Sequence, residues 1–204
     1  MIKKIYVTAL LSCGLIACSP AISEEESINE SLQPVNEEKV ETIKVEPAKK
    51  YKWDCVGCNT QEQMALKAFQ DRGITDKLAL ATLMGNIKHE SQFKPDICEG
   101  GARVPYEHCH TGGFGLIQWT TVNRYNGLGN FCKKYDCNPS TTEGQLRYLF
   151  NEYQWTRSEP VFKTPGKTIE WYTQHGAYPW LGWGIHGART DYSYNYARML
   201  VEVT

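Results

Sequence analysis

Apolar residues follow a helical spacing in the stretch from residue 76 to residue 91. Four of them occupy positions i, i+3, i+4 and i+7, which form one face of a helix: Leu80, Leu83, Met84 and Ile87. Thr75 or Asp76 can cap the first turn, and Pro95 prevents the helix from continuing. Glu90 comes three residues after Ile87, so it extends the apolar face at the C-terminal end of the predicted helix.

This position gives Glu90 the properties of a proton donor. Partial burial disfavours a charged carboxyl and raises its pKa. The negative end of the helix macrodipole acts in the same direction. We expect both effects to raise the pKa of Glu90 without any charged neighbour, as a general acid at near-neutral pH requires. The alternative is an ordinary surface glutamate in the last turn of a helix.

Further helix signals predict a mainly α domain. Thr60–Gln63 reads as a capping box and Gly73 as the end of the helix that follows. Ser140–Glu143 reads as a second capping box, before a helix with this buried face: Leu146, Leu149, Phe150 and Tyr153. Residues 168–175 and 189–201 are predicted as the last two helices. Residues 178–184 (YPWLGWG) are predicted to form an aromatic loop that floors a sugar subsite.

Three motifs resemble a known enzyme family. They are GNIKHESQFKP at residues 85–95, GFGLIQWT at 113–120 and QLRYLFNE at 145–152. The chain resembles the phage tail lysozyme family within the lysozyme-like superfamily, over roughly residues 60–200. The Glu-Ser pair and the Gly-Leu-Ile-Gln turn are also similar to soluble lytic transglycosylases.

The resemblance implies a lysozyme-like α+β fold, in which residues 96–113 form a small β-hairpin or loop as one lip of a sugar cleft. Strands are expected only in that lip. Glu90 is implied as the catalytic acid, and the Gly-Leu-Ile-Gln turn is implied to line the cleft. The expected substrate-binding residues are Ser91, Phe114, Gly115, Gln118 and Trp119. Trp119 in particular is expected to offer a stacking face, whereas Glu152 is expected to form a structural ion pair.

The expected reaction is cleavage of the β-1,4 bond between N-acetylmuramic acid and N-acetylglucosamine. Hydrolysis uses a second carboxylate or a positioned water, and the candidate carboxylates are Asp96, Glu99 and Glu107. A lytic transglycosylase instead forms 1,6-anhydro ends with Glu90 alone. Two alternatives are not enzymes. One is a non-catalytic peptidoglycan-binding lipoprotein, and the other is an inhibitor or periplasmic interaction partner that uses the aromatic loop.

The net charge and the aromatic content limit the classes of molecule that the protein is expected to bind. The net charge of −1 over 204 residues argues against a nucleic-acid binder that neutralises phosphates. Aromatic residues make up 12% of the chain and suit contacts with sugar rings. The family resemblance implies glycan strands of peptidoglycan as the partner, and we expect a monomeric protein with no cofactor.

The first residues predict export. Lys3 and Lys4 precede an apolar run that ends at Ala17 and is too short to span a bilayer. Residues 15–18 (LIAC) resemble a bacterial lipobox, which makes residues 1–17 a lipoprotein signal peptide and Cys18 the acylated N-terminus. Ser19 after this cysteine favours the outer membrane, facing the periplasm. An ordinary cleaved signal or a short anchor is the alternative.

Residues 18–52 are predicted to be the lipidated cysteine and a disordered acidic tether. Eight Glu, five Lys and few aromatic residues cannot bury enough apolar surface to offset the entropy of ordering. The catalytic domain is predicted to span residues 53–204.

Six cysteines remain after Cys13 and Cys18 are set aside. An even number in an exported chain predicts disulfides. Sequence alone leaves the pairing open, and we expect local bonds: Cys55 with Cys58, Cys98 with Cys109, and Cys132 with Cys137. The alternatives are a redox pair in the Cys55-x-x-Cys58 motif and a zinc site with these ligands: Cys98, His108, Cys109 and His110. No metal site is expected.

Overall fold

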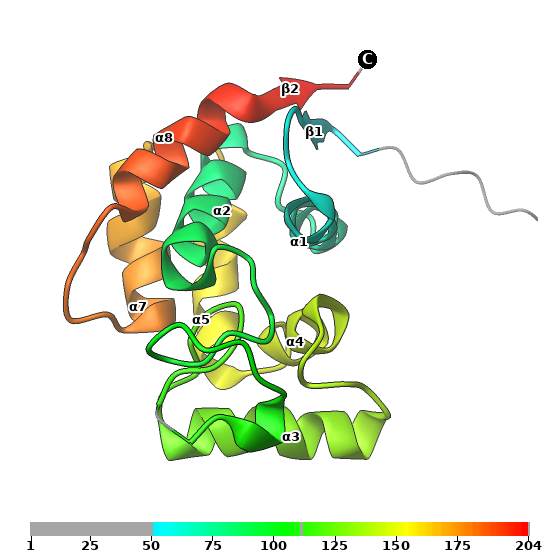
Figure 1. Cartoon of the computed structure of the whole chain (residues 1–204). Helices are drawn as coiled ribbons and strands as arrows, with labels where there is room; N and C mark the ends of the chain where they lie inside the picture. Colours follow the sequence, from blue (N-terminus) through cyan, green and yellow to red (C-terminus); the bar gives the residue numbers. More distant parts are fainter. Residues whose placement is uncertain (1–50, 111, 204) are drawn as a thin grey trace, which may run out of the picture. The chain divides into compact units, whose positions relative to one another are not determined.

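The computed structural model describes residues 51–110 and 112–203, which fold mainly into helices (Figure 1). The predicted mainly α fold class is confirmed. Cys18 and the tether up to residue 50 lie outside the described residues. The elements are β1 (Trp53–Cys55), α1 (Thr60–Asp71), α2 (Lys77–Ser91), η1 (Tyr106–His108), α3 (Val122–Tyr135), α4 (Thr142–Leu149), α5 (Tyr153–Phe162), α6 (Ile169–Tyr172), η2 (Thr173–Ala177), α7 (Tyr178–Leu181), α8 (Arg189–Met199) and β2 (Leu200–Glu202).

Helix α2 is buried around its whole circumference between residues 79 and 87. The single apolar face predicted from the sequence is therefore too narrow. The reason is that α1, α6 and α8 all pack against α2. Two of its buried polar side chains bond within the helix: the Thr82 hydroxyl donates to the Leu78 carbonyl, and the Asn86 amide donates to the Thr82 carbonyl.

Helix α2 packs closely against α8 at Gly85. A Cβ atom at Gly85 would lie 2.4 Å from the backbone nitrogen of Ser193, so only glycine fits there. This close approach fixes α8 against α2. Because α8 begins at Arg189, it also brings the first turn of α8 to the C-terminal end of α2.

The described residues contain one two-stranded sheet, which joins the two ends of the domain. β1 pairs antiparallel with β2, with Trp53 opposite Glu202 and Cys55 opposite Leu200. The expectation that strands occur only in the cleft lip is wrong. The lip has two isolated β-bridges, Ile97–Arg103 and Cys98–Phe114, because most of its residues form turns.

The helix caps differ from the prediction by about one residue. Asn59, not Thr60, caps α1 and forms the capping box with Glu62. Thr141 caps α4 by accepting from the Gly144 N–H group, so the second capping box is absent there. Asp76 caps α2, as predicted for Thr75 or Asp76. Tyr153 was expected in the buried face of α4, but α4 ends earlier and Tyr153 is 67% exposed at the start of α5.

Two buried glutamates tie the helices together. Glu152 accepts hydrogen bonds from Arg124, Trp119 and Trp180, and so joins α3, α7 and the segment before α3; its predicted structural ion pair is confirmed. Glu62 accepts from Lys88 of α2 at 2.9 Å and from Tyr196 of α8 at 2.5 Å.

The three local disulfides expected from the sequence are present: Cys55–Cys58, Cys98–Cys109 and Cys132–Cys137. The second closes the lip, and the third closes the turn after α3. Cys98 and Cys109 are bonded to each other, so their thiolates are not free for zinc.

The pairing of Glu62 predicts a pH-dependent stability. Burial alone would raise the pKa of Glu62, but hydrogen bonds from Tyr196 and Lys88 outweigh it and hold that pKa below the ordinary value of 4.5. The carboxylate therefore stabilises the fold above about pH 4.5, and this stability is lost as the pH falls through the lower pKa of the folded state. Glu62→Gln should reduce the free energy of unfolding at pH 7 and flatten its decline in acid.

Urea unfolding at a series of pH values measures this effect. Glu143→Gln, at an exposed position in the first turn of α4, is the control and should follow the wild-type curve. Parallel curves for wild type and Glu62→Gln would contradict the prediction.

Candidate active site

Glu90 lies in the last turn of α2 with 14% of its side chain exposed. The chain then turns through two non-glycine residues with left-handed backbone, Gln92 at φ 54° and Phe93 at φ 61°. Gln118 in the Gly-Leu-Ile-Gln turn is a third, at φ 52°. Backbone held in such sparsely populated conformations gathers at functional sites. Here it marks the end of α2 and the turn beside it.

Ser91 joins these two segments. Its hydroxyl donates to the Leu116 carbonyl at 2.8 Å and accepts from the Phe93 N–H group at 3.1 Å. The side chain is 2% exposed. The expectation that Ser91 binds substrate is therefore wrong for its side chain, because this side chain holds the turn against the helix that carries Glu90.

Gln145 holds the same turn from the other side. Its amide oxygen accepts from the Leu116 N–H group at 2.8 Å, and its amide nitrogen donates to the carbonyls of Pro95 and Pro139. Gly115 makes room for this amide, since a Cβ atom there would lie 2.4 Å from it. The role of Gly115 is thus to let a buried side chain approach the backbone.

Arg189, at the start of α8, forms an ion pair with Glu90 in the last turn of α2. Its Nη2 donates to Glu90, while its Nη1 donates to the carbonyls of Ile185 at 2.8 Å and His186 at 2.7 Å. The expectation that Glu90 has no charged neighbour is wrong. The reason is the tight packing of α8 on α2, which places a cation that the local sequence around Glu90 does not reveal.

His89 lies near Arg189 of this ion pair. Burial lowers the pKa of His89, and its electrostatic interactions with Arg189 and His186 lower it further. The neutral imidazole is therefore favoured beside the arginine at neutral pH. His89 also lies against Gly187, where a Cβ atom would come within 2.3 Å of the ring.

Residues 60–179 match the model of the phage tail lysozyme family, which is more than half of the chain. The chain belongs to this family. No curated protein and no solved structure matches it significantly. Membership in the phage tail lysozyme family indicates a peptidoglycan hydrolase type of activity. The matched segment contains Glu90 and the Gly-Leu-Ile-Gln turn, but it ends before Arg189.

The other predicted contact residues differ in exposure. Gln118 is partly exposed, and its amide donates to the Gly115 carbonyl at 3.0 Å. Phe114 and Trp119 are fully buried. Trp119 does not present a stacking face, because its ring packs in the core and its indole N–H donates to Glu152 at 3.2 Å. A core tryptophan and a sugar-stacking tryptophan look the same in a sequence.

The predicted aromatic loop, residues 178–184, is partly helical. Residues 178–181 form α7, and Trp180 is buried. Trp183 is partly exposed, and its ring centroid lies 4.5 Å from the guanidinium carbon of Arg189. An aromatic face therefore does lie near Glu90, but it covers the arginine.

The three candidate second carboxylates lie in the lip. Asp96 pairs with Arg103, and Glu99 accepts from the Gly113 N–H group at 3.1 Å. Glu107 is exposed on η1. The first two carboxylates thus have structural partners within the lip itself.

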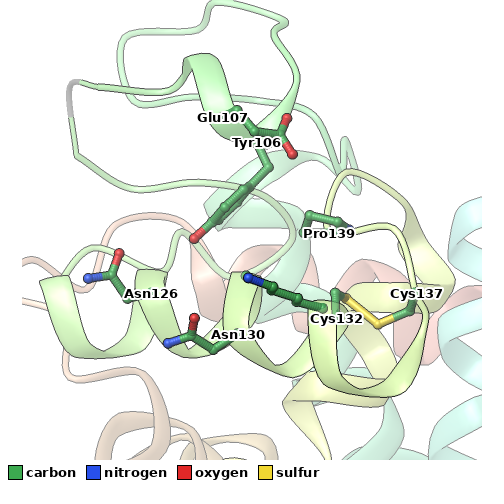
Figure 2. A pocket seen from close by; sticks show the side chains of 9 residues that line it. Tyr106, Glu107, Asn126, Asn130, Cys132, Cys137 and Pro139 are labelled. Carbon is green, nitrogen blue, oxygen red and sulfur yellow. A yellow bond between two sulfur atoms is a disulfide. The ribbon is translucent and has the colours of Figure 1, made fainter.

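A cavity of about 520 Å³ lies between η1 and α3. Figure 2 shows Tyr106 above α3, with Asn126 and Asn130 on that helix and Pro139 across the hollow. Glu90 is not among the residues that line this cavity. Within residues 51–110 and 112–203, no group of three or more His, Cys, Asp or Glu side chains is arranged to hold a metal ion.

The three backbone partners of Gln145 predict a test of how the turn is held. Gln145→Ala leaves the buried Leu116 N–H group without an acceptor, which costs about 1–3 kcal/mol. It should also lower peptidoglycan cleavage, because the turn beside Glu90 loosens. Urea unfolding and a turbidity assay measure the two effects.

Asn151→Ala is the control, since this exposed amide donates to one helix carbonyl. If Gln145→Ala changes stability and cleavage no more than Asn151→Ala does, the role given to Gln145 is wrong.

Proposed function

We propose that this protein cleaves the β-1,4 bond between N-acetylmuramic acid and N-acetylglucosamine, with Glu90 as the general acid. The observation that carries the proposal is the position of Glu90. It is a mostly buried carboxyl at the end of the central helix, joined through Ser91 to a turn that the family match includes. A buried carboxyl beside strained backbone is more typical of a reactive group than of a surface charge.

In the proposed reaction the protonated Glu90 donates its proton to the glycosidic oxygen. The bond to the anomeric carbon then breaks, and positive charge develops on the sugar ring. Hydrolysis requires a water molecule activated by a carboxylate. The carboxylate left on Glu90 can serve as that base, or a lip carboxylate can do so.

A lytic transglycosylase is the second candidate. It needs one carboxylate. After Glu90 has donated its proton, the 6-hydroxyl of the muramic acid attacks the anomeric carbon, and the Glu90 carboxylate takes up the proton of that hydroxyl. Asp96 pairs with Arg103, and Glu99 accepts from the Gly113 N–H group. Because both carboxylates already bond within the lip, these contacts favour a route with one carboxylate. A non-catalytic peptidoglycan-binding protein is the outcome if no bond is cut.

Glu90→Gln keeps the size of the side chain and removes the proton donor. Turnover of purified peptidoglycan should fall by at least about 10²–10⁴-fold, the contribution of general acid catalysis. The turbidity of a cell-wall suspension measures the rate, and circular dichroism verifies the fold.

The exposed Glu143→Gln is the matched control and should keep wild-type activity. If a folded Glu90→Gln variant cuts peptidoglycan at the wild-type rate, Glu90 is not the acid.

We further propose that Cys18 is acylated and anchors the protein to the outer membrane, facing the periplasm. The lipobox-like residues 15–18 and Ser19 support this. Several acyl chains on one residue give stable anchoring. Among the described residues no helix is both long and apolar enough for a membrane span. The acidic residues 19–52 would then separate the anchor from the domain.

Cys18→Ala tests the anchor. The variant should leave the membrane fraction or accumulate with its signal peptide uncut, as seen by cell fractionation and intact-protein mass spectrometry. Cys13→Ala is the control and should fractionate as wild type. Retention of Cys18→Ala in the outer membrane would contradict the proposal.

A further inference from the structure

Arg189 is held by contacts on several sides. Its side chain is 4% exposed, and its guanidinium donates to Glu90 and to two carbonyls of the preceding loop, those of Ile185 and His186. Trp183 covers one face at 4.5 Å. A side chain held this way has little freedom, so it presents a fixed positive charge to the carboxylate of Glu90.

We propose that Arg189 is the positioning residue of the catalytic acid. It orients the carboxyl of Glu90 and stabilises the carboxylate that remains once Glu90 has given its proton to the glycosidic oxygen. The inference rests on the proposed function of Glu90. Arg189 contacts Glu90, so its effect on the reaction passes through that carboxyl.

The contacts require an arginine. A planar guanidinium carries five N–H donors in a fixed fork, so it can donate to a carboxylate and to two carbonyls at once. A lysine ammonium preserves the charge but not this fork of donors. Arg189→Lys should therefore keep only part of the wild-type kcat.

The loop before α8 packs against α2 through Gly187 and His89. Gly187 has φ 59°, which favours glycine, and its missing side chain leaves space for the ring of His89. The Ile185 and His186 carbonyls precede this turn and face the guanidinium. Residues 185–187 thus hold Arg189 while resting against the helix that carries Glu90.

Other titratable groups face this ion pair. They are His89 on α2, His186 on the loop and Tyr192 on α8, whose ring centroid lies 6.3 Å from that of His89. His89 favours its neutral form, as its lowered pKa indicates. Arg189 is the charged group in direct contact with Glu90.

Loss of this charge has a defined consequence. A carboxylate without its cationic partner holds a proton more tightly. A general acid is active while protonated, so the alkaline limb of the kcat/KM profile should move to higher pH in Arg189→Met. At the same time kcat should fall by roughly 10²-fold, because the carboxyl is no longer oriented.

The experiment measures kcat, KM and the pH profile on soluble glycan fragments for wild type, Arg189→Met and Arg189→Lys. Arg72→Met is the matched control. Arg72 likewise pairs with a glutamate, Glu159 at 2.8 Å, and lies over an aromatic ring, that of Phe150 at 5.5 Å. This control should keep both the wild-type kcat and the wild-type pH profile.

We expect Arg189→Met to lower kcat with little change in KM and to move the alkaline limb upward, and Arg189→Lys to lie between Met and wild type. Wild-type kcat and pH profile in folded Arg189→Met would overturn the inference while leaving Glu90 as the acid. If Arg189→Met does not fold, the lysine variant decides: unchanged kcat there overturns the inference. Wild-type protein that cuts no glycan would instead overturn the proposed function itself.

Discussion

The burial of α2 on all sides is the constraint on which the rest of the domain depends. A helix enclosed by α1, α6 and α8 can neither rotate nor slide, so its last turn emerges at a fixed place. Gly85 sets one of these close contacts, where the α8 backbone leaves no space for a side chain. Glu90 therefore gains its position from the core and not from the loops around it. This arrangement suits a reactive carboxyl, because a site on a rigid element keeps its geometry.

Polar groups inside the protein then connect the lip and the later helices to that core. Ser91 and Gln145 satisfy the backbone of the turn at residues 115–118, so this turn keeps one conformation beside Glu90. Glu62 binds Lys88, two residues before Glu90, and joins it to α8 through Tyr196. These side chains are fully engaged with the protein. Several of the polar and aromatic residues near Glu90 thus stabilise the site through contacts within the protein.

The sequence predicted the parts of the protein that depend on local pattern. Helical spacing placed Glu90 at the end of a helix, and short separations along the chain predicted the disulfide pairs. Arg189 was missed because 99 residues separate it from Glu90 and no periodic signal marks it. Trp119 was assigned wrongly because burial depends on the whole fold. The sheet was misplaced for a similar reason, since β1 and β2 come from opposite ends of the domain.

The central claim is that the protein cuts peptidoglycan between N-acetylmuramic acid and N-acetylglucosamine. The most direct measurement is mass spectrometry of purified peptidoglycan after digestion, with and without borohydride reduction of the products. We expect fragments that end in N-acetylmuramic acid, either as a reducible end or as a 1,6-anhydro end that is lighter by one water. Fragments ending in reducible N-acetylglucosamine, or intact glycan strands after prolonged digestion, would contradict it.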